Sequence, residues 1–209
     1  TLVVTIMSSI GAIFFAFILI TGCKTTPKQD TAFTLVEDSG ISFSNTIDNT
    51  PDFNIFNYRN FYNGGGCAIG DLNNDGLPEV FLTANMGSNK LFQNKGDFKF
   101  EDISEKAGIG EALKWSTGVV LADINNDGWL DIYVCNAGYQ KGMIQDNALF
   151  INNKDLTFTD KAREYGLADA GYTTHAAFFD YDLDGDLDAY ILNNSFIPVN
   201  TINYANKRE

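Results

Sequence analysis

Three short acidic stretches recur along the chain with the same spacing of carboxylates, amides and a glycine. They are "DLNNDGLPE" at 71–79, "DINNDGWLD" at 123–131 and "DYDLDGDLD" at 180–188, and all fit D-x-[ND]-x-D-G-x-x-[DE]. Carboxylates this close together repel one another unless a cation lies between them. Oxygen donors at positions 1, 3, 5 and 9, with a main-chain carbonyl at position 7, suit Ca²⁺, which takes about six to eight oxygen ligands. The spacing therefore predicts about three bound calcium ions.

The predicted ligands follow from these positions. Glycine at position 6 permits the sharp turn, because it tolerates positive φ. Position 7 contributes a main-chain oxygen and the other positions contribute side chains. The predicted metal-binding residues are Asp71, Asn73, Asp75, Leu77 and Glu79 in the first loop; Asp123, Asn125, Asp127, Trp129 and Asp131 in the second; and Asp180, Asp182, Asp184, Asp186 and Asp188 in the third.

Two other interpretations of these loops are weaker. An EF-hand loop starts in the same way but requires an acid at position 12 and flanking helices, whereas position 12 here is Leu82, Val134 or Ile191 in β-prone runs. Ordinary Asn/Asp/Gly turns are common in β proteins, but they need no acid at position 9 in every copy. The charge balance also favours a bound cation. The loops hold 11 of the 27 acidic residues, which leaves 16 acids against 14 bases.

The elements that must position these loops are β-strands. Each loop lies between two apolar runs, and "NKLFQNKGDFKFEDISEKAGI" at 89–109 aligns with "NALFINNKDLTFTDKAREYGL" at 147–167. Within the first copy, a hairpin turning at Asn94–Gly96 is expected. Both copies end in a segment that could form one or two helical turns, and "FTLVEDSGI" at 33–41 is a shorter echo.

The repeat length indicates the architecture. The loops begin 52 and then 57 residues apart, and an insertion of about six residues within 137–146 accounts for the difference. A unit of about 50 residues with about four strands predicts an all-β fold of β-propeller blades. A β-solenoid is the alternative, although its coils are usually shorter. Three loops account for about three blades of a larger propeller, so the chain is expected to be the N-terminal part of a longer protein.

The first 22 residues carry no charge and are long enough to cross a bilayer as a helix. They could be a retained transmembrane anchor or a signal peptide. The stretch Ile20-Thr21-Gly22-Cys23 resembles the bacterial lipobox, so residues 1–23 are expected to be a lipoprotein signal peptide with lipidation at Cys23. Residues 24–32 then form a polar tether, and 33–209 form the partial propeller. Export permits a Cys67–Cys135 disulfide, and buried free thiols are equally consistent with the sequence.

The loops and their flanking strands resemble the FG-GAP/VCBS repeat. More narrowly, "WSTGVVLADINNDGWLDIYVCNAG" and "THAAFFDYDLDGDLDAYILNN" resemble bacterial lipoprotein relatives of the cartilage acidic protein (ASPIC/UnbV) family. The resemblance implies an exported, calcium-stabilised propeller, often of seven blades, that serves as a recognition scaffold at the outer membrane, on its surface or periplasmic face. One departure is that Gly64–Ala68 and Gly118-Val119 replace the Phe-Gly…Gly-Ala-Pro signature.

Taken together, these features predict a lipid-anchored binding protein for an extracellular protein or glycan, with 137–146 as a contact loop. A net charge of −13 argues against nucleic acid as a partner. The alternative is a propeller enzyme, a hydrolase or lyase, whose active site lies in further blades, but no nucleophile–base pair can be named here. The one histidine, His175, is expected to be structural, and Trp115 and Trp129 are expected to pack rather than bind sugar.

Overall fold

The computed structural model describes residues 32–109, 114–138 and 145–195. The chain divides into two units, Thr1–Val36 and Glu37–Glu209. The predicted signal peptide, its lipidation site Cys23 and nearly all of the tether lie outside the described residues. Among the residues that are described, no helix is both long and apolar enough to span a membrane.

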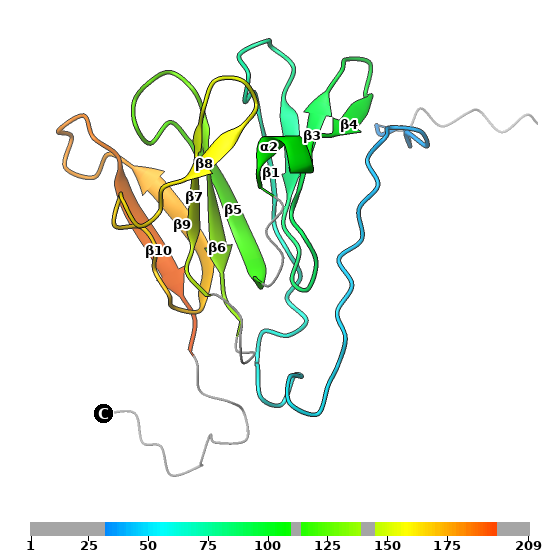
Figure 1. Ribbon diagram of the computed structural model, residues 1–209, viewed down its shortest axis with the longest axis vertical. Helices are drawn as coiled ribbons and strands as arrows, with labels where there is room; N and C mark the ends of the chain where they lie inside the picture. The colour runs from blue at the N-terminus through cyan, green and yellow to red at the C-terminus, as the bar shows by residue number, and fades with distance from the viewer. Residues whose placement is uncertain (1–31, 110–113, 139–144, 196–209) are drawn as a thin grey trace, which may run out of the picture. The chain divides into compact units, whose positions relative to one another are not determined.

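The second unit is built from antiparallel sheets, as expected for an all-β fold (Figure 1). Two sheets have four strands in the order in which the chain makes them, and a third has two. The strands of the first sheet are β1 (Cys67–Gly70), β2 (Glu79–Leu82), β3 (Lys90–Asn94) and β4 (Phe100–Asp102). Those of the second are β5 (Ser116–Ala122), β6 (Asp131–Asn136), β7 (Ala148–Asn152) and β8 (Phe158–Asp160), and those of the third are β9 (Thr173–Phe179) and β10 (Asp188–Asn193).

A four-stranded antiparallel meander for each repeat is the arrangement of a propeller blade. The expected hairpin of the first repeat is present, with its turn at 95–99, slightly later than predicted. The short helix α2 (Ser104–Ala107) forms where a helical turn was expected after β4, and the corresponding segment after β8 contains turns. The structure therefore confirms blades, whereas the total number of blades stays a prediction.

The sheets are held together by apolar cores between them. One core joins the first and second sheets, with Phe81 and Leu91 on one side and Ile132 and Phe150 on the other. A second core joins the second and third sheets, where Tyr133 meets Phe178 edge to face. Burial alternates along β2, where a slip of one residue would turn the apolar side chains away from the core, whereas β6 and β7 are buried along their whole length.

The innermost strands approach closely at glycine. A Cβ on Gly66 would lie 2.7 Å from the carbonyl oxygen of Thr117 in β5, and one on Gly118 would lie 2.5 Å from that of Thr174 in β9. These two glycines stand at the same place in successive repeats. They belong to the segments that replace the Phe-Gly…Gly-Ala-Pro signature, and they allow each inner strand to contact the next.

Candidate metal loops

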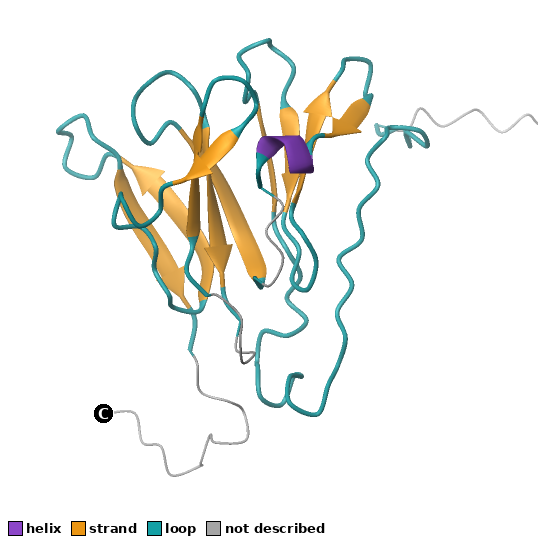
Figure 2. Cartoon of the chain, viewed as in Figure 1, coloured by secondary structure: helices purple, strands orange, loops and turns teal. Residues whose placement is uncertain are grey.

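Each acidic loop closes the hairpin between the first two strands of its sheet. Figure 2 shows these loops between β1 and β2, β5 and β6, and β9 and β10. In all three hairpins the acid at position 9 begins the second strand and pairs with the residue just before the loop: Gly70 with Glu79, Ala122 with Asp131, and Phe179 with Asp188. Position 12 falls inside a strand each time, which agrees with the exclusion of an EF-hand.

The acid at position 1 organises the turn. The carboxylate of Asp71 accepts hydrogen bonds from the main-chain N–H groups of Asp75 (3.2 Å) and Gly76 (2.8 Å). The same pair of bonds recurs in the second loop, at 2.9 and 2.8 Å, and in the third, at 3.2 and 3.1 Å. Glycine at position 6 has φ values of 85°, 84° and 95° in the three loops, so it adopts the left-handed conformation that the sequence predicted.

Positions 3 and 5 interact with each other and with position 7. Asn73 donates its side-chain N–H to Asp75 at 2.8 Å, and Asn125 donates to Asp127 at 3.0 Å. The position 5 carboxylate also accepts the main-chain N–H of position 7, Leu77, Trp129 or Asp186, at 2.8, 3.0 and 2.9 Å. Ligation by the main-chain oxygens of these three residues stays a prediction.

The third loop brings three carboxylates together most closely. One oxygen from each of Asp180, Asp182 and Asp188 lies within 4.8 Å of the others. Among the described residues, this is the one such group of acidic, histidine or cysteine side chains. Asp184 is not part of the group, and its carboxylate accepts the main-chain N–H of Asp186. In the other two loops position 3 is asparagine, so an amide replaces one of the three carboxylates.

The acid at position 9 differs from the others because it is buried in two of the loops. Glu79 is 1% exposed and Asp131 is 0% exposed. Each accepts the main-chain N–H of position 2, from Leu72 at 2.9 Å and from Ile124 at 3.0 Å. Burial raises the pKa of both carboxyl groups, and the neighbouring acids at positions 1 and 5 raise it further. A cation in the loop would offset both effects.

Two asparagines that the sequence analysis missed support position 9 from the third strand of each blade. The main-chain N–H of Asn94 donates to Glu79 at 3.3 Å, and that of Asn152 donates to Asp131 at 2.9 Å. Their side chains donate to the carbonyl of position 8, Pro78 at 3.0 Å and Leu130 at 3.0 Å. The available signal was their identical place in the aligned stretches "KLFQN" and "ALFIN".

A lysine was also missed. The ammonium group of Lys154 lies 3.3 Å from a carboxylate oxygen of Asp127 in the second loop. Burial raises the pKa of Asp127, but hydrogen bonds from Asn125, Trp129 and Lys154 outweigh this effect and leave the pKa below its usual value. The second loop therefore has a local positive charge of its own.

The loops supply only oxygen donors, from carboxylates, side-chain amides and main-chain carbonyls. Such a set suits a hard cation that prefers oxygen, such as calcium or magnesium, better than zinc or copper. The repeated turn, the gathered carboxylates and the raised pKa values at position 9 fit a bound cation. The arrangement of these donors is therefore compatible with binding of a hard cation in each loop.

Other candidate residues have simpler roles in the structure. Cys67 is exposed and Cys135 is buried, and both are free thiols; burial raises the pKa of Cys135 to about 12. Trp115 packs against Phe53 and Phe61 as expected. His175 is exposed on β9, where it pairs with Leu192 of β10, and its expected structural role stays a prediction.

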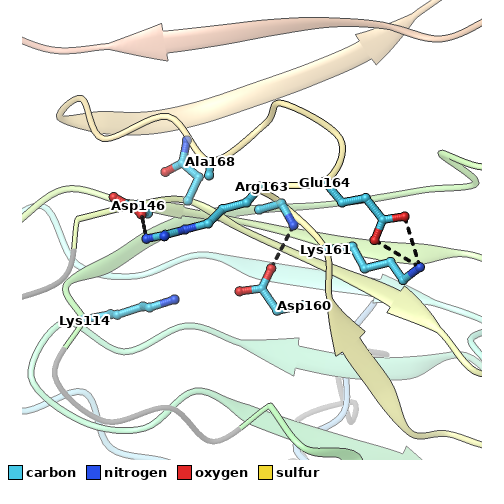
Figure 3. Close-up of a pocket in the computed structure, with 9 residues that line it drawn as sticks. Lys114, Asp146, Asp160, Lys161, Arg163, Glu164 and Ala168 are labelled. Carbon is cyan, nitrogen blue, oxygen red and sulfur yellow. Dashed lines mark hydrogen bonds and ion pairs between the residues drawn. The ribbon is translucent and has the colours of Figure 1, made fainter.

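A polar pocket lies at the other end of the second blade, where β5 begins. It has a volume of about 410 Å³ and includes Lys114 and Asp146, the latter being the last residue of the predicted contact segment 137–146. Figure 3 shows Arg163 directed toward Asp146, at 2.7 Å, and Lys161 toward Glu164, at 3.3 Å. Residues 139–144 of that segment lie outside the described residues.

Comparison with known proteins supports the repeat assignment. Residues 71–134, which contain the first two loops, match the FG-GAP-like repeat family. Cartilage acidic protein 1 of Xenopus tropicalis is 34% identical over 140 residues, covering 66% of this chain and 21% of that protein. The human protein of the same name is 37% identical over 76 residues, covering 36% of this chain and 12% of its own length. The chain thus spans about a fifth or less of these relatives, and the predicted resemblance is confirmed.

Proposed function

We propose that this chain is a calcium-stabilised β-propeller scaffold that recognises a protein or a glycan. The observation that carries the proposal is the repetition of one oxygen-rich turn at three hairpins, each closed in the same register. The similarity to FG-GAP-like repeats and to cartilage acidic protein 1 supports a scaffold of this kind. Calcium serves as a clamp that offsets the repulsion among the loop carboxylates, with one ion in each of the three loops.

Thermal unfolding in calcium and in chelator tests the clamp. We expect calcium to raise the unfolding midpoint, since a site at a hundredfold its dissociation constant contributes about 2.7 kcal/mol. The control is the triple variant Asp71→Ala, Asp123→Ala and Asp180→Ala, which removes the position 1 carboxylates and should unfold at the same temperature in both buffers. If the wild type unfolds cooperatively at the same midpoint with and without calcium, the loops are ordinary turns and do not bind calcium.

Recognition is assigned to the end opposite the acidic loops. The repeat varies in length at 137–146, and the polar pocket beside Asp146 offers both donors and acceptors to a ligand. Deleting 139–144 should abolish partner binding without lowering the calcium-induced rise in stability. Unchanged binding after this deletion would exclude the segment as the contact loop.

The remaining parts of the proposal concern location and chemistry. Lipidation at Cys23 would anchor the scaffold to the bacterial outer membrane. Incorporation of labelled fatty acid into the wild type, and its loss in Cys23→Ser, tests this anchor.

A propeller hydrolase or lyase is the second candidate function, favoured only if further blades supply a nucleophile and a base. Nucleic acid is not a proposed partner, because the net charge is −13.

A further inference from the structure

The first and second acidic loops are bonded to each other through side chains. Asn74 in the first loop donates to the main-chain oxygen of Gly128 in the second, at 3.1 Å. Asn152, at the end of β7, donates its side-chain N–H groups to the carbonyl of Leu72 in the first loop, at 2.8 Å, and to that of Leu130 in the second, at 3.0 Å. These contacts join the two hairpins at the ends where cations are proposed to bind.

Asn152 is connected to a predicted ligand in each loop. Its main-chain N–H donates to Asp131, the position 9 acid of the second loop. Its side chain binds the carbonyl of Leu72, and Leu72 in turn donates its main-chain N–H to Glu79, the position 9 acid of the first loop. Asn152 is 3% exposed, so water does not readily replace these bonds. These bonds thus link the position 9 acids of the two neighbouring loops.

The second and third loops are separated instead. A cavity of about 670 Å³ lies between them, with Asp123–Asn126 on one side and Gly185–Ala189 on the other. No hydrogen bond joins these two loops in the part of the chain that the structure describes. The three loops are thus alike in local geometry but unequal in their connections.

We infer that Asn152 couples the first two loops, so that a divalent cation bound in one strengthens binding in the other, while the third loop binds independently. This inference rests on the proposed calcium sites. Its physical reason is that a loop must be ordered before its donors can hold a cation. When one loop is filled, the shared hydrogen bonds order the other in advance and reduce the entropy lost on the second binding step. Asn152 is a positioning residue in this scheme.

Asn94 provides a matched control. It occupies the same place in the first blade and makes the same contacts to position 9 and position 8 of its own loop. Among the described residues, Asn94 makes no hydrogen bond to another acidic loop. Asn94→Ala and Asn152→Ala therefore remove similar support from one loop, but only Asn152→Ala also removes a bond between loops.

Terbium luminescence sensitised by Trp129 reports on the second loop when excitation is restricted to tryptophan, because Tyr181 in the third loop also sensitises terbium. Terbium is a luminescent substitute for calcium, and Trp129 occupies position 7 of that loop. The full chain is titrated with terbium after the first loop is disabled by Asp71→Ala with Asp75→Ala, or the third by Asp180→Ala with Asp184→Ala. We expect loss of the first loop to weaken terbium binding at the second about fivefold, and loss of the third to leave it unchanged. Trp129→Phe should remove the signal.

The same comparison is then made in two backgrounds. In Asn94→Ala the roughly fivefold dependence on the first loop should persist, and in Asn152→Ala it should be smaller, with the Asn74–Gly128 bond remaining. Equal dependence in both backgrounds, or none in the wild type, overturns the coupling while leaving the calcium sites intact. Absence of terbium signal and of calcium-dependent stabilisation overturns the proposed calcium function itself, and the coupling with it.

Discussion

At the scale of single residues, the acids of each loop divide into two kinds. Those at positions 1 and 5 lie in the turn, where they accept main-chain N–H groups and, at position 5 of the first two loops, an asparagine side-chain N–H. Glu79 and Asp131 at position 9 are buried, and their two oxygens accept N–H groups from separate segments. The position 9 acid therefore has a structural role in addition to its predicted role as a ligand.

Replacing Glu79 tests this structural role. Glu79→Gln places an amide N–H₂ where a carboxylate oxygen now accepts from Leu72 or Asn94, so one buried donor loses its partner. We expect a loss of about 1–3 kcal/mol in the free energy of unfolding, even in chelator. Denaturant unfolding with and without calcium measures it.

Asp75→Asn is the control for this substitution. Asp75 is exposed, and its amide replacement still offers an oxygen to Leu77. In chelator this variant should unfold within about 0.5 kcal/mol of the wild type, because exposed substitutions have small effects. In calcium it should lose part of the metal-induced stabilisation. If Glu79→Gln also left the free energy of unfolding in chelator unchanged, the position 9 acid would have no structural role apart from binding a cation.

At the residue scale, residue types and spacing located the three turns and their glycines, because all of these lie within nine consecutive residues. Ligation of a cation by the loop residues stays a prediction. Asn94, Asn152 and Lys154 reach the loops from another strand or turn. Their roles depend on the register between strands, which spacing along the chain does not specify.

At the scale of elements, the packing of inner strands depends on a missing side chain. Gly118 in β5 faces the main chain of β9, and a Cβ there would lie 2.5 Å from the oxygen of Thr174. Backbone atoms cannot rotate away as a flexible side chain would, so the strands themselves must separate.

Gly118→Ala should therefore lower the free energy of unfolding by about 1–3 kcal/mol. Gly87→Ala is the matched control, because a Cβ at Gly87 would lie 3.6 Å from its nearest neighbour, an ordinary contact. Thermal and denaturant unfolding compare the two. Equal stability of both variants would show that the inner strands do not need their close approach.

A repeated hydrogen-bond chain joins the blades at the other end of the inner strands. Asn89 donates to the hydroxyl of Ser116, at 3.2 Å, and that hydroxyl donates to Asn136 at 2.8 Å. One repeat later, Asn147 donates to Thr173 at 3.0 Å and Thr173 donates to Asn193 at 2.7 Å. Asn89 and Asn147 begin the two aligned stretches of the sequence, but their bonds to the next blade depend on tertiary packing.

At the scale of the whole molecule, the third sheet differs from the first two. Its described part has two strands, and β10 leaves Tyr190 and Leu192 exposed at 62% and 49%. In the second blade the corresponding strand, β6, is fully buried. Repeat folds bury each unit against its neighbours, so an uncovered strand exposes both apolar side chains and unpaired main-chain groups.

We expect the chain to self-associate through β10 as its concentration rises. Leu192→Lys places a charge on this strand and should keep the chain monomeric to higher concentration. The control is Leu183→Lys, which adds the same charge at an exposed position in the third acidic loop. Sedimentation velocity over a range of concentrations distinguishes them. Equal self-association of all three proteins would place the contact elsewhere.

The two ends of each blade differ in how constant they are from one repeat to the next, which matters for protein engineering. The hairpin register at the acidic loops is the same in successive blades, although the connection at 137–146 is about six residues longer than its counterpart. The scaffold thus absorbs a change of length at one end without shifting the turn at the other. Foreign peptides grafted at 137–146 would be displayed from a frame whose rigidity, under the proposed calcium binding, is adjusted separately by the calcium concentration of the solution.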